Sequence, residues 1–289
     1  MRDIRAEIED VNEIVPFPAV VAGVMAELLS NEVAIKKIIQ LIETDVALTA
    51  LILRVANSAY YGLRGEVTSV SSSVMMLGIE EVNRLMLIYQ MKQRIFRLNK
   101  EQRLYLERLW KHSVSTAVIA RDLSSLLLYQ CDGKEFTAGL LHDMGKIVLV
   151  QHFSHSLIVT QKMIADLGLT DVEAEMQSLA ITHAEIGGSL GEMWNLPPLF
   201  VEVMRYHHSP ADAVLDPKLV TIVRTADVLS ELWNMGIGEQ TEKKIIAETD
   251  VWKVLLQEFP RMGDLDAALV EQQLKSDFAS HKEFVQMML

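Results

Sequence analysis

The residues from Gly139 to Lys146 place an imidazole, a carboxylate and an ammonium group among apolar side chains. This composition is typical of a buried helix, so the polar groups need partners or must reach a cleft. Adjacent side chains diverge by roughly 100° on a helix, and a metal ion lodged between His142 and Asp143 would touch both. Lys146 shares a helical face with His142, where it can hold a phosphate oxygen. An ordinary buried His–Asp hydrogen bond, with Lys146 at the helix end, is the alternative interpretation.

Further imidazole and carboxylate groups follow along the chain, several of them at core-facing positions of predicted helices. They are His112, His183, the pair His207–His208, and Asp227. Burying an unpaired carboxylate such as Asp227 is costly, which predicts a cation beside it or a shifted pKa. Arg108, one turn before His112, predicts a cation rather than a carboxylate beside that imidazole. Each histidine alone is also consistent with a packed or surface side chain, but together with Asp227 they supply the ligand types of divalent transition metals.

The helices that must position these groups follow from a helical pattern that runs almost throughout the chain. Only 14 Gly and 7 Pro interrupt it, and strict period-two alternation is absent, which predicts an all-α fold. We expect two packed helical lobes, residues 1–97 and 98–289, with Asn99 as the N-cap that opens the second. A helical stretch from Thr68 to Met91 is expected to break near Gly78. Residues 235–289 are predicted to form packing helices.

Two start signals define helices of the second lobe. Thr170 with Glu173 predicts a capping box at the start of a helix that runs to residue 194, in which His183 faces the core. Asp216–Pro217 predicts the N-cap and the first residue of another helix, which carries the carboxylate named above on its core-facing side.

The length, residue composition and net charge of the chain exclude several classes of protein. With 289 residues, 50% of them hydrophobic and 23% charged, the chain is globular and long enough for a sizeable core. A formal net charge of −12 and a pI near 5.2 disfavour general binding to nucleic acids. The single cysteine, Cys131, excludes an internal disulfide framework and suits a reducing compartment. Without a signal-peptide core or an apolar run of about 18 residues, a cytoplasmic protein with no membrane span is expected. The oligomeric state stays open.

The order His112, His142–Asp143, Asp227 resembles the H…HD…D signature of HD-domain metal-dependent phosphohydrolases. The resemblance implies an HD-like helical core in the second lobe, in which these four residues bind a first metal ion. His183 and the pair His207–His208 resemble the fuller binuclear set of the HD-GYP branch. That similarity implies that Asp143 bridges to a second ion held by these three histidines.

Lys146 matches the phosphate-contacting lysine of the HDxGK motif in that branch, so the resemblance assigns catalytic roles to Asp143 and Lys146. It implies one or two divalent ions of Fe, Mn, Zn, Ni or Mg, with an empty site as the alternative. Two ions would lower the pKa of a bridging water and neutralise phosphoryl oxygens. The chain continues with Ser209-Pro210-Ala211-Asp212 and lacks the Gly-Tyr-Pro element of that branch, which disfavours cleavage of cyclic di-nucleotides.

Segments outside this signature resemble the HDOD domain. In order along the chain they are Pro16-Phe17-Pro18, Leu41-Ile42-Glu43-Thr44-Asp45, Ala56-Asn57-Ser58-Ala59, Leu77-Gly78, Trp110-Lys111-His112-Ser113, Gly139-Leu140-Leu141-His142-Asp143 and Trp194-Asn195-Leu196-Pro197. Together they span roughly residues 14 to 230. Val46 departs from the proline that commonly follows the aspartate. The resemblance implies a bacterial module of signal transduction or regulation with an all-helical, two-lobed fold.

Three hypotheses for function follow. The first is a cytoplasmic signalling module with a metal-capable pocket, which acts through contacts with a protein partner or a small phosphorylated ligand. The second is a metal-dependent phosphohydrolase acting on a nucleotide or cyclic nucleotide. The third is a structural metal that ties the helices of the second lobe together without turnover. The added N-terminal lobe and the missing Gly-Tyr-Pro element favour the first.

Overall fold

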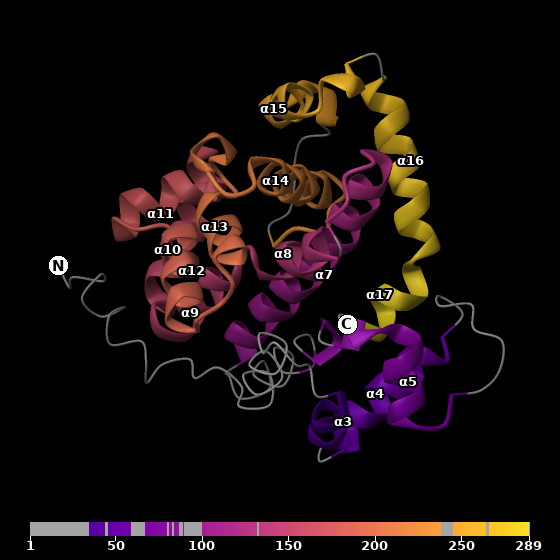
Figure 1. Ribbon diagram of the computed structural model, residues 1–289. Helices are drawn as coiled ribbons and strands as arrows, with labels where there is room; N and C mark the ends of the chain where they lie inside the picture. The colour runs from indigo at the N-terminus through magenta and orange to yellow at the C-terminus, as the bar shows by residue number, and fades with distance from the viewer. Residues whose placement is uncertain are drawn as a thin grey trace. The chain divides into compact units, whose positions relative to one another are not determined.

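The computed structural model describes residues 35–43, 46–58, 67–79, 81, 82, 84–86, 89, 100–131, 133–237, 245–263 and 266–288, and every regular element among them is a helix (Figure 1). The all-α prediction is therefore confirmed. Within these stretches, no helix is both long and apolar enough to cross a membrane.

The chain divides into two compact units. The large unit includes residues 98–279, and the small unit includes residues 17–97 together with 280–289. The division expected from the sequence kept all of residues 98–289 in one lobe, whereas residues 280–289 group here with the small unit.

The small unit contains α3 (Ile35–Glu43), α4 (Val46–Ala56), α5 (Val70–Leu77) and α17 (Lys282–Met288). The first three pack on one another, and Ile38 and Ile42, one helical turn apart, are fully buried. The helix α5 ends at Gly78, which adopts a φ of 79° that favours glycine. The break predicted near Gly78 is confirmed, while Met91 and Asn99 lie outside the described residues.

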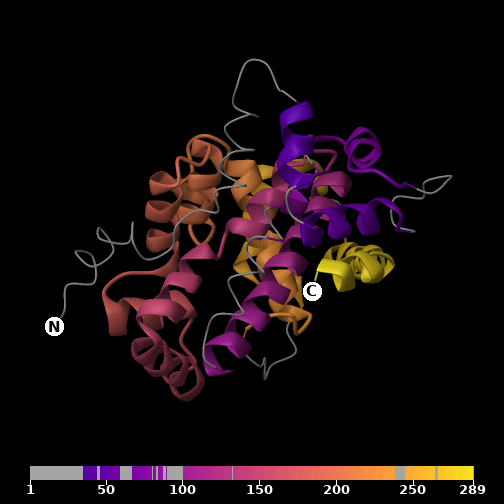
Figure 2. The ribbon, with the colours of Figure 1, turned by 90° about the horizontal axis from the view of Figure 1, so that it is seen from below.

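The large unit contains the helices that carry the candidate site. They are α7 (Lys100–Leu126), α8 (Lys134–Leu141), α9 (Met144–His152), α10 (Ser154–Leu167), α11 (Asp171–Leu179), α12 (His183–Met193), α13 (Pro198–Tyr206), α14 (Pro217–Leu232), α15 (Asp250–Glu258) and α16 (Ala267–Ser280). The long helix α7 packs against both α8 and α14, and α12 packs against α9 and α13. In both views α9 to α13 gather on one side of α7, and α16 lies on the other (Figures 1 and 2).

Apolar residues at helical spacing join α7, α14, α15 and α16 into one core. Members of this cluster are Ile119, Leu123, Ile222, Leu229, Leu255 and Leu274. Glu271 of α16 adds polar contacts, because its carboxylate accepts hydrogen bonds from Trp233 Nε1 and from the Ile246 amide, both at 3.1 Å. The described part of residues 235–289 therefore packs as helices, and its members in the large unit hold α7 and α14 together.

The single helix predicted from Thr170 to residue 194 is wrong. Two helices occupy this stretch, because Ala180 adopts the left-handed conformation with a φ of 57° and ends α11. Thr182 then caps α12 through a second capping box with Glu185. The repeated Thr-x-x-Glu pattern was present in the sequence and marks this second start. As a result His183 is the first residue of α12 rather than part of a continuous stripe.

Candidate metal centre

Seven side chains of the large unit converge in two groups at its centre. The three-histidine group consists of Asp143, His183, His207 and His208, and the two-histidine group consists of His112, His142 and Asp227. Within each group the nearest ligand atoms lie within 4.8 Å of one another. All seven residues are buried except His208, which is half-buried. The structure therefore brings together every residue that the sequence nominated as a metal ligand.

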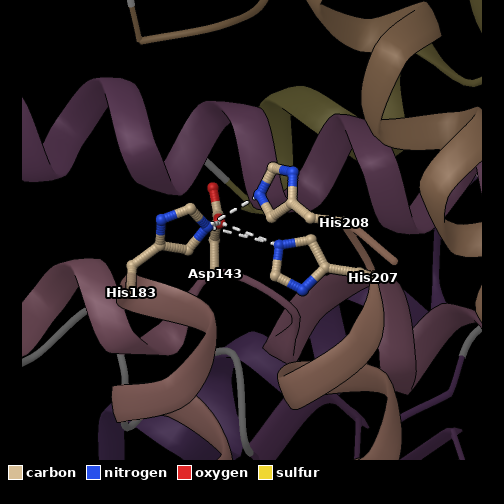
Figure 3. Close-up of side chains that lie close together, drawn as sticks. All are labelled: Asp143, His183, His207 and His208. Atoms are coloured by element: carbon tan, nitrogen blue, oxygen red, sulfur yellow. Dashed lines mark hydrogen bonds and ion pairs between the residues drawn. The ribbon is translucent and has the colours of Figure 1, made fainter. Parts of the chain in front are cut away.

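Each ligand comes from a helix or from the end of one. The middle of α7 carries His112, and the middle of α14 carries Asp227. The beginning of α12 supplies His183, while the pair His207–His208 follows the end of α13. Figure 3 shows three of these imidazoles surrounding the carboxylate of Asp143.

The apolar pattern predicted that His142 and Asp143 lie within one helix. They lie instead between two helices. The helix α8 ends at Leu141, α9 begins at Met144, and the two polar residues form the turn between them. This turn is held by glycines at close approaches: a Cβ on Gly139 would lie 2.8 Å from the Cα of Ala117 in α7. A side chain at position 139 would push the turn away from α7, so Gly139 fixes the depth of His142 and Asp143.

Asp143 faces both groups with different oxygens. Its Oδ1 lies 3.2 Å from His183 Nε2 and 3.7 Å from His207 Nε2. Its Oδ2 lies 3.5 Å from the Nε2 atoms of both His112 and His142. One carboxylate thus stands between two sets of nitrogen donors, which is the position that a bridging ligand requires.

Four of the histidines turn their Nδ1 atoms away from the centre towards hydrogen-bond partners. These partners are Ser230 Oγ for His112 at 2.7 Å, the Gly139 carbonyl for His142 at 2.7 Å, Glu175 Oε2 for His183 at 2.7 Å, and the Met204 carbonyl for His207 at 3.1 Å. A carbonyl or carboxylate partner requires a proton on Nδ1, which leaves the lone pair on the inward-facing Nε2. The same arrangement orients histidines that ligate metals.

The donor atoms have the spacing that a metal ion requires, and two of them make no hydrogen bond in the described structure. His183 Nε2 lies 2.9 Å from His208 Nε2 and 3.3 Å from His207 Nε2. Two ligands about 2.1 Å from a tetrahedral ion are themselves about 3.4 Å apart. In the described structure, His142 Nε2 and Asp143 Oδ1 are buried without a hydrogen-bond partner. The residues present therefore fit one or two divalent ions.

Two side-chain cations pair with the carboxylates of the centre. Lys146 Nζ lies 2.8 Å from Asp143 Oδ2 and 2.8 Å from Asp171 Oδ2. Arg224 donates to Asp227 Oδ2 at 2.6 Å. The cation expected beside Asp227 is therefore Arg224, located one turn earlier in α14. Arg108 is exposed, and the charged neighbours of His112 are carboxylates, so the cation predicted beside that imidazole is wrong.

The electrostatic environment shifts the pKa values of the ionisable groups in the site in different directions. Burial opposes ionisation of Asp143, but Lys146 and the nearby imidazoles hold its pKa well below the usual range. Burial lowers the pKa of His207 to about 4. Burial also disfavours the imidazolium of His183, yet the carboxylates of Glu175 and Asp143 outweigh it and raise the pKa of His183 to about 10. An incoming metal ion would displace that proton.

A cavity of about 510 Å³ opens beside the two groups. His112 from one group and His208 from the other line it, together with the cations Lys146 and Arg224. Glu231 lies on the same wall, where burial and the nearby Asp227 carboxylate raise its pKa to about 8. The cavity can admit a small polar ligand next to the candidate ions.

Several residues of the site were not identified from the sequence. They are Asp171, Glu175, Arg224, Ser230 and Glu231. A signal existed for two of them, because Arg224 and Ser230 lie three residues before and after Asp227 and so share its helical face. Glu175 pairs with His183 across the break between α11 and α12, which the predicted continuous helix did not include.

The order of these residues and the helical fold agree with a match to the HDOD domain over residues 14–210. The chain belongs to the HDOD family. The HDOD resemblance drawn from the sequence is thereby confirmed.

One relative of this HDOD protein matches at low sequence identity. A protein of Treponema pallidum without an assigned function is 25% identical over 209 residues, which cover 71% of this chain and 40% of the relative. The chain thus spans well under two thirds of the length of that relative.

Three solved structures share the fold. An HDOD domain protein from Geobacter sulfurreducens is 22% identical with a TM-score of 0.76, and the match covers 99% of both chains. A candidate phosphohydrolase from Shewanella amazonensis is 20% identical with a TM-score of 0.71, covering 97% of this chain and 96% of the other. A candidate signal transduction protein from Marinobacter aquaeolei is 21% identical with a TM-score of 0.68, covering 97% of this chain and 61% of the other.

Proposed function

We propose that this HDOD protein is a regulatory module of signal transduction whose large unit binds one or two divalent transition-metal ions. The observation that carries the proposal is the position of Asp143 between two sets of inward-facing histidine nitrogens. Membership of the HDOD family and the fold shared with a candidate signal transduction protein support the regulatory role. We further propose a cytoplasmic location, in keeping with the free, buried thiol of Cys131.

Metal binding would act on the fold because the ligands come from separate helices. An ion in the three-histidine group would join the turn before α9 to the start of α12 and the end of α13. An ion in the two-histidine group would join the same turn to α7 and α14. The metal content would thereby set the stability of the cavity wall, which a protein partner or a small phosphorylated ligand would sense.

Elemental analysis and thermal unfolding test this proposal directly. The purified full chain should contain a divalent transition metal in a ratio of about one or two ions per chain. Removing it with a chelator should lower the melting temperature by about 10 °C, because ligand at a thousand times its Kd contributes about 4 kcal/mol. His207→Gln should lose the tightly bound ion and most of the chelator effect, whereas His152→Gln, at an exposed position outside the centre, should retain both. An unchanged melting temperature and no bound ion would overturn the proposal.

Metal-dependent binding, measured together with hydrogen exchange, separates a regulatory metal from a purely structural one. For a regulatory role, chelation should increase exchange in α11 and α14 around the cavity, and the increase should alter binding of a ligand or partner. A metal that is only structural would raise the melting temperature while leaving phosphorylated compounds and partner proteins without any metal-dependent binding.

The second candidate function is a metal-dependent phosphohydrolase acting on a nucleotide or cyclic nucleotide. It is favoured by one observation: Lys146 and Arg224 line a cavity that reaches both histidine groups. Bound ions would supply Lewis acidity and an activated water. Lys146 and Arg224 would orient the phosphoryl oxygens through charged hydrogen bonds, and the surrounding helices would exclude bulk water.

A phosphodiesterase assay with metal-loaded protein tests this second candidate. Hydrolysis of bis(p-nitrophenyl) phosphate should require added Mn²⁺ and should vanish in Asp143→Ala. Lys146→Met should raise the KM or lower kcat by about 10²-fold while leaving the metal content intact. Hydrolysis that persists in Asp143→Ala would come from a contaminant and would remove the support for this candidate.

A further inference from the structure

We infer that the two groups bind metal ions unequally and that Arg224 sets the difference. The three-histidine group takes an ion first, and the guanidinium of Arg224 restrains binding at the two-histidine group. The inference rests on the proposed function, since it requires a centre that binds divalent ions. It concerns the order of loading and the residue that controls it.

The three-histidine group offers a complete set of donors to one ion. Three imidazoles and one carboxylate oxygen make the four ligands of a tetrahedral shell (Figure 3). The oxygen on this side, Asp143 Oδ1, is buried, lacks a hydrogen bond, and has only the imidazoles of His183 and His207 at 3.2 and 3.7 Å as its ion-pair neighbours in the described structure. An ion here would coordinate a buried oxygen that makes no hydrogen bond in the described structure.

Both carboxylates that face the two-histidine group, Asp227 of the group itself and the neighbouring Asp143, already pair with a cation. Arg224 Nη1 lies 2.6 Å from Asp227 Oδ2, and Lys146 Nζ lies 2.8 Å from Asp143 Oδ2, the oxygen that faces this group. A cation on a carboxylate weakens its donation to a metal and repels an incoming divalent ion. Both pairs are largely withdrawn from solvent, so the repulsion is only partly screened.

Of these two cations, Arg224 is the one whose removal affects a single group. Lys146 is shared between Asp143 and Asp171, and its Asp143 partner belongs to both groups. Arg224 contacts a carboxylate that belongs only to the two-histidine group. Its removal should therefore change one metal-binding step and leave the other. The protein would hold one ion over a wide range of metal concentration and a second only when the metal is abundant.

Cobalt titration of the metal-free full chain measures both steps. Calorimetry and the visible absorption of bound Co²⁺ should resolve two binding events whose Kd values differ by at least about tenfold. In Arg224→Gln the second event should tighten by about tenfold or more, because a positive charge beside the ion is removed, while the first changes by less than about twofold. Arg224→Lys keeps the charge and should keep the weak second event.

A matched control removes a positive charge elsewhere. Lys253 pairs with Asp250 at the same i,i+3 spacing as Arg224 with Asp227, but on the exposed surface. Lys253→Gln should leave both Kd values unchanged. If it tightens the second event as Arg224→Gln does, general charge rather than Arg224 is responsible, and the inference is wrong.

Histidine variants test the order without changing Arg224. His207→Gln should remove the tight event and leave the weak one, and His112→Gln should do the reverse. Two equal events in the wild-type chain, or a second event that is unchanged or weaker in Arg224→Gln, would overturn the inference and assign Arg224 to orienting Asp227. A wild-type chain that binds no Co²⁺ at all would overturn the proposed function, which is a different result from any of these.

Discussion

Gly145 packs against the first turn of α12 so closely that a methyl group on its Cα would overlap the carbonyl oxygen of His183. The contact joins the turn that carries Asp143 to the helix end that carries His183. The atoms nearest to such a methyl group, His183 O and Gly187 N, belong to the backbone, so neither can rotate aside. The spacing of donors in the three-histidine group therefore depends on a residue without a side chain.

Gly145→Ala should destabilise the protein by on the order of 1–3 kcal/mol and weaken metal binding, because α9 and α12 must separate. Chemical denaturation and Co²⁺ calorimetry measure the two effects. Gly187→Ala is the matched control, since a Cβ there would meet its nearest atom at an ordinary 3.5 Å. That variant should change stability by less than about 1 kcal/mol. Equal effects of the two substitutions would contradict the close approach described here.

Glu175→Gln should weaken Co²⁺ binding by about 10- to 100-fold. The carboxylate of Glu175 accepts hydrogen bonds from both the Nδ1 atom and the backbone amide of His183, at 2.7 and 2.8 Å. An amide loses the negative charge that orients this imidazole and strengthens its donation. Glu173→Gln, two residues earlier and exposed, should leave the Kd unchanged. A Kd that shifts equally in both variants would show that Glu175 does not position His183.

The two capping boxes give a second matched pair. Thr170→Ala and Thr182→Ala should each cost about 1 kcal/mol of stability, because each threonine caps a helix through a Glu three residues later. Only Thr182→Ala should also weaken metal binding, since Thr182 directly precedes His183 at the start of α12. Denaturant titration and calorimetry distinguish the outcomes. A loss of metal affinity in Thr170→Ala would show that the two helices respond as one.

The thiol of Cys131 should react slowly with iodoacetamide in the native protein. Burial raises its pKa to about 11, so its rate should rise about tenfold per pH unit between pH 7 and 10. In denaturant the thiol should ionise near pH 8.5 and react much faster at neutral pH. The raised pKa also means that the unfolded state is favoured as pH rises from about 8.5 towards 11. Native and denatured rates that agree at pH 8 would contradict the burial.

The fold and the inward-facing polar side chains were predictable because each depends on local pattern. Their assignment as metal ligands came from the family resemblance and stays a prediction. Apolar residues at helical spacing identify α7 and α14, and they show that His112 and Asp227 face inward. The adjacent pair His142–Asp143 stands out among apolar neighbours. These signals need no knowledge of which helices meet.

The contacts that orient the ligands could not be predicted in the same way. Ser230 reaches His112 from 118 residues away along the chain, and only the packing of α14 on α7 brings the two together. The end of α11 depends on the left-handed conformation of Ala180, which alanine adopts rarely and no composition signal marks. Pairing between distant segments and unusual backbone angles are properties of the assembled core.

The position of α14 has a consequence for where the functional unit ends. The HDOD match stops at residue 210, yet α14 contributes Asp227, Arg224 and Ser230 to the centre from beyond that boundary. A gene fragment cut at residue 210 would encode the three-histidine group but only part of the two-histidine group. Recombination at the family boundary would therefore separate two groups of side chains that the intact chain brings together at one centre.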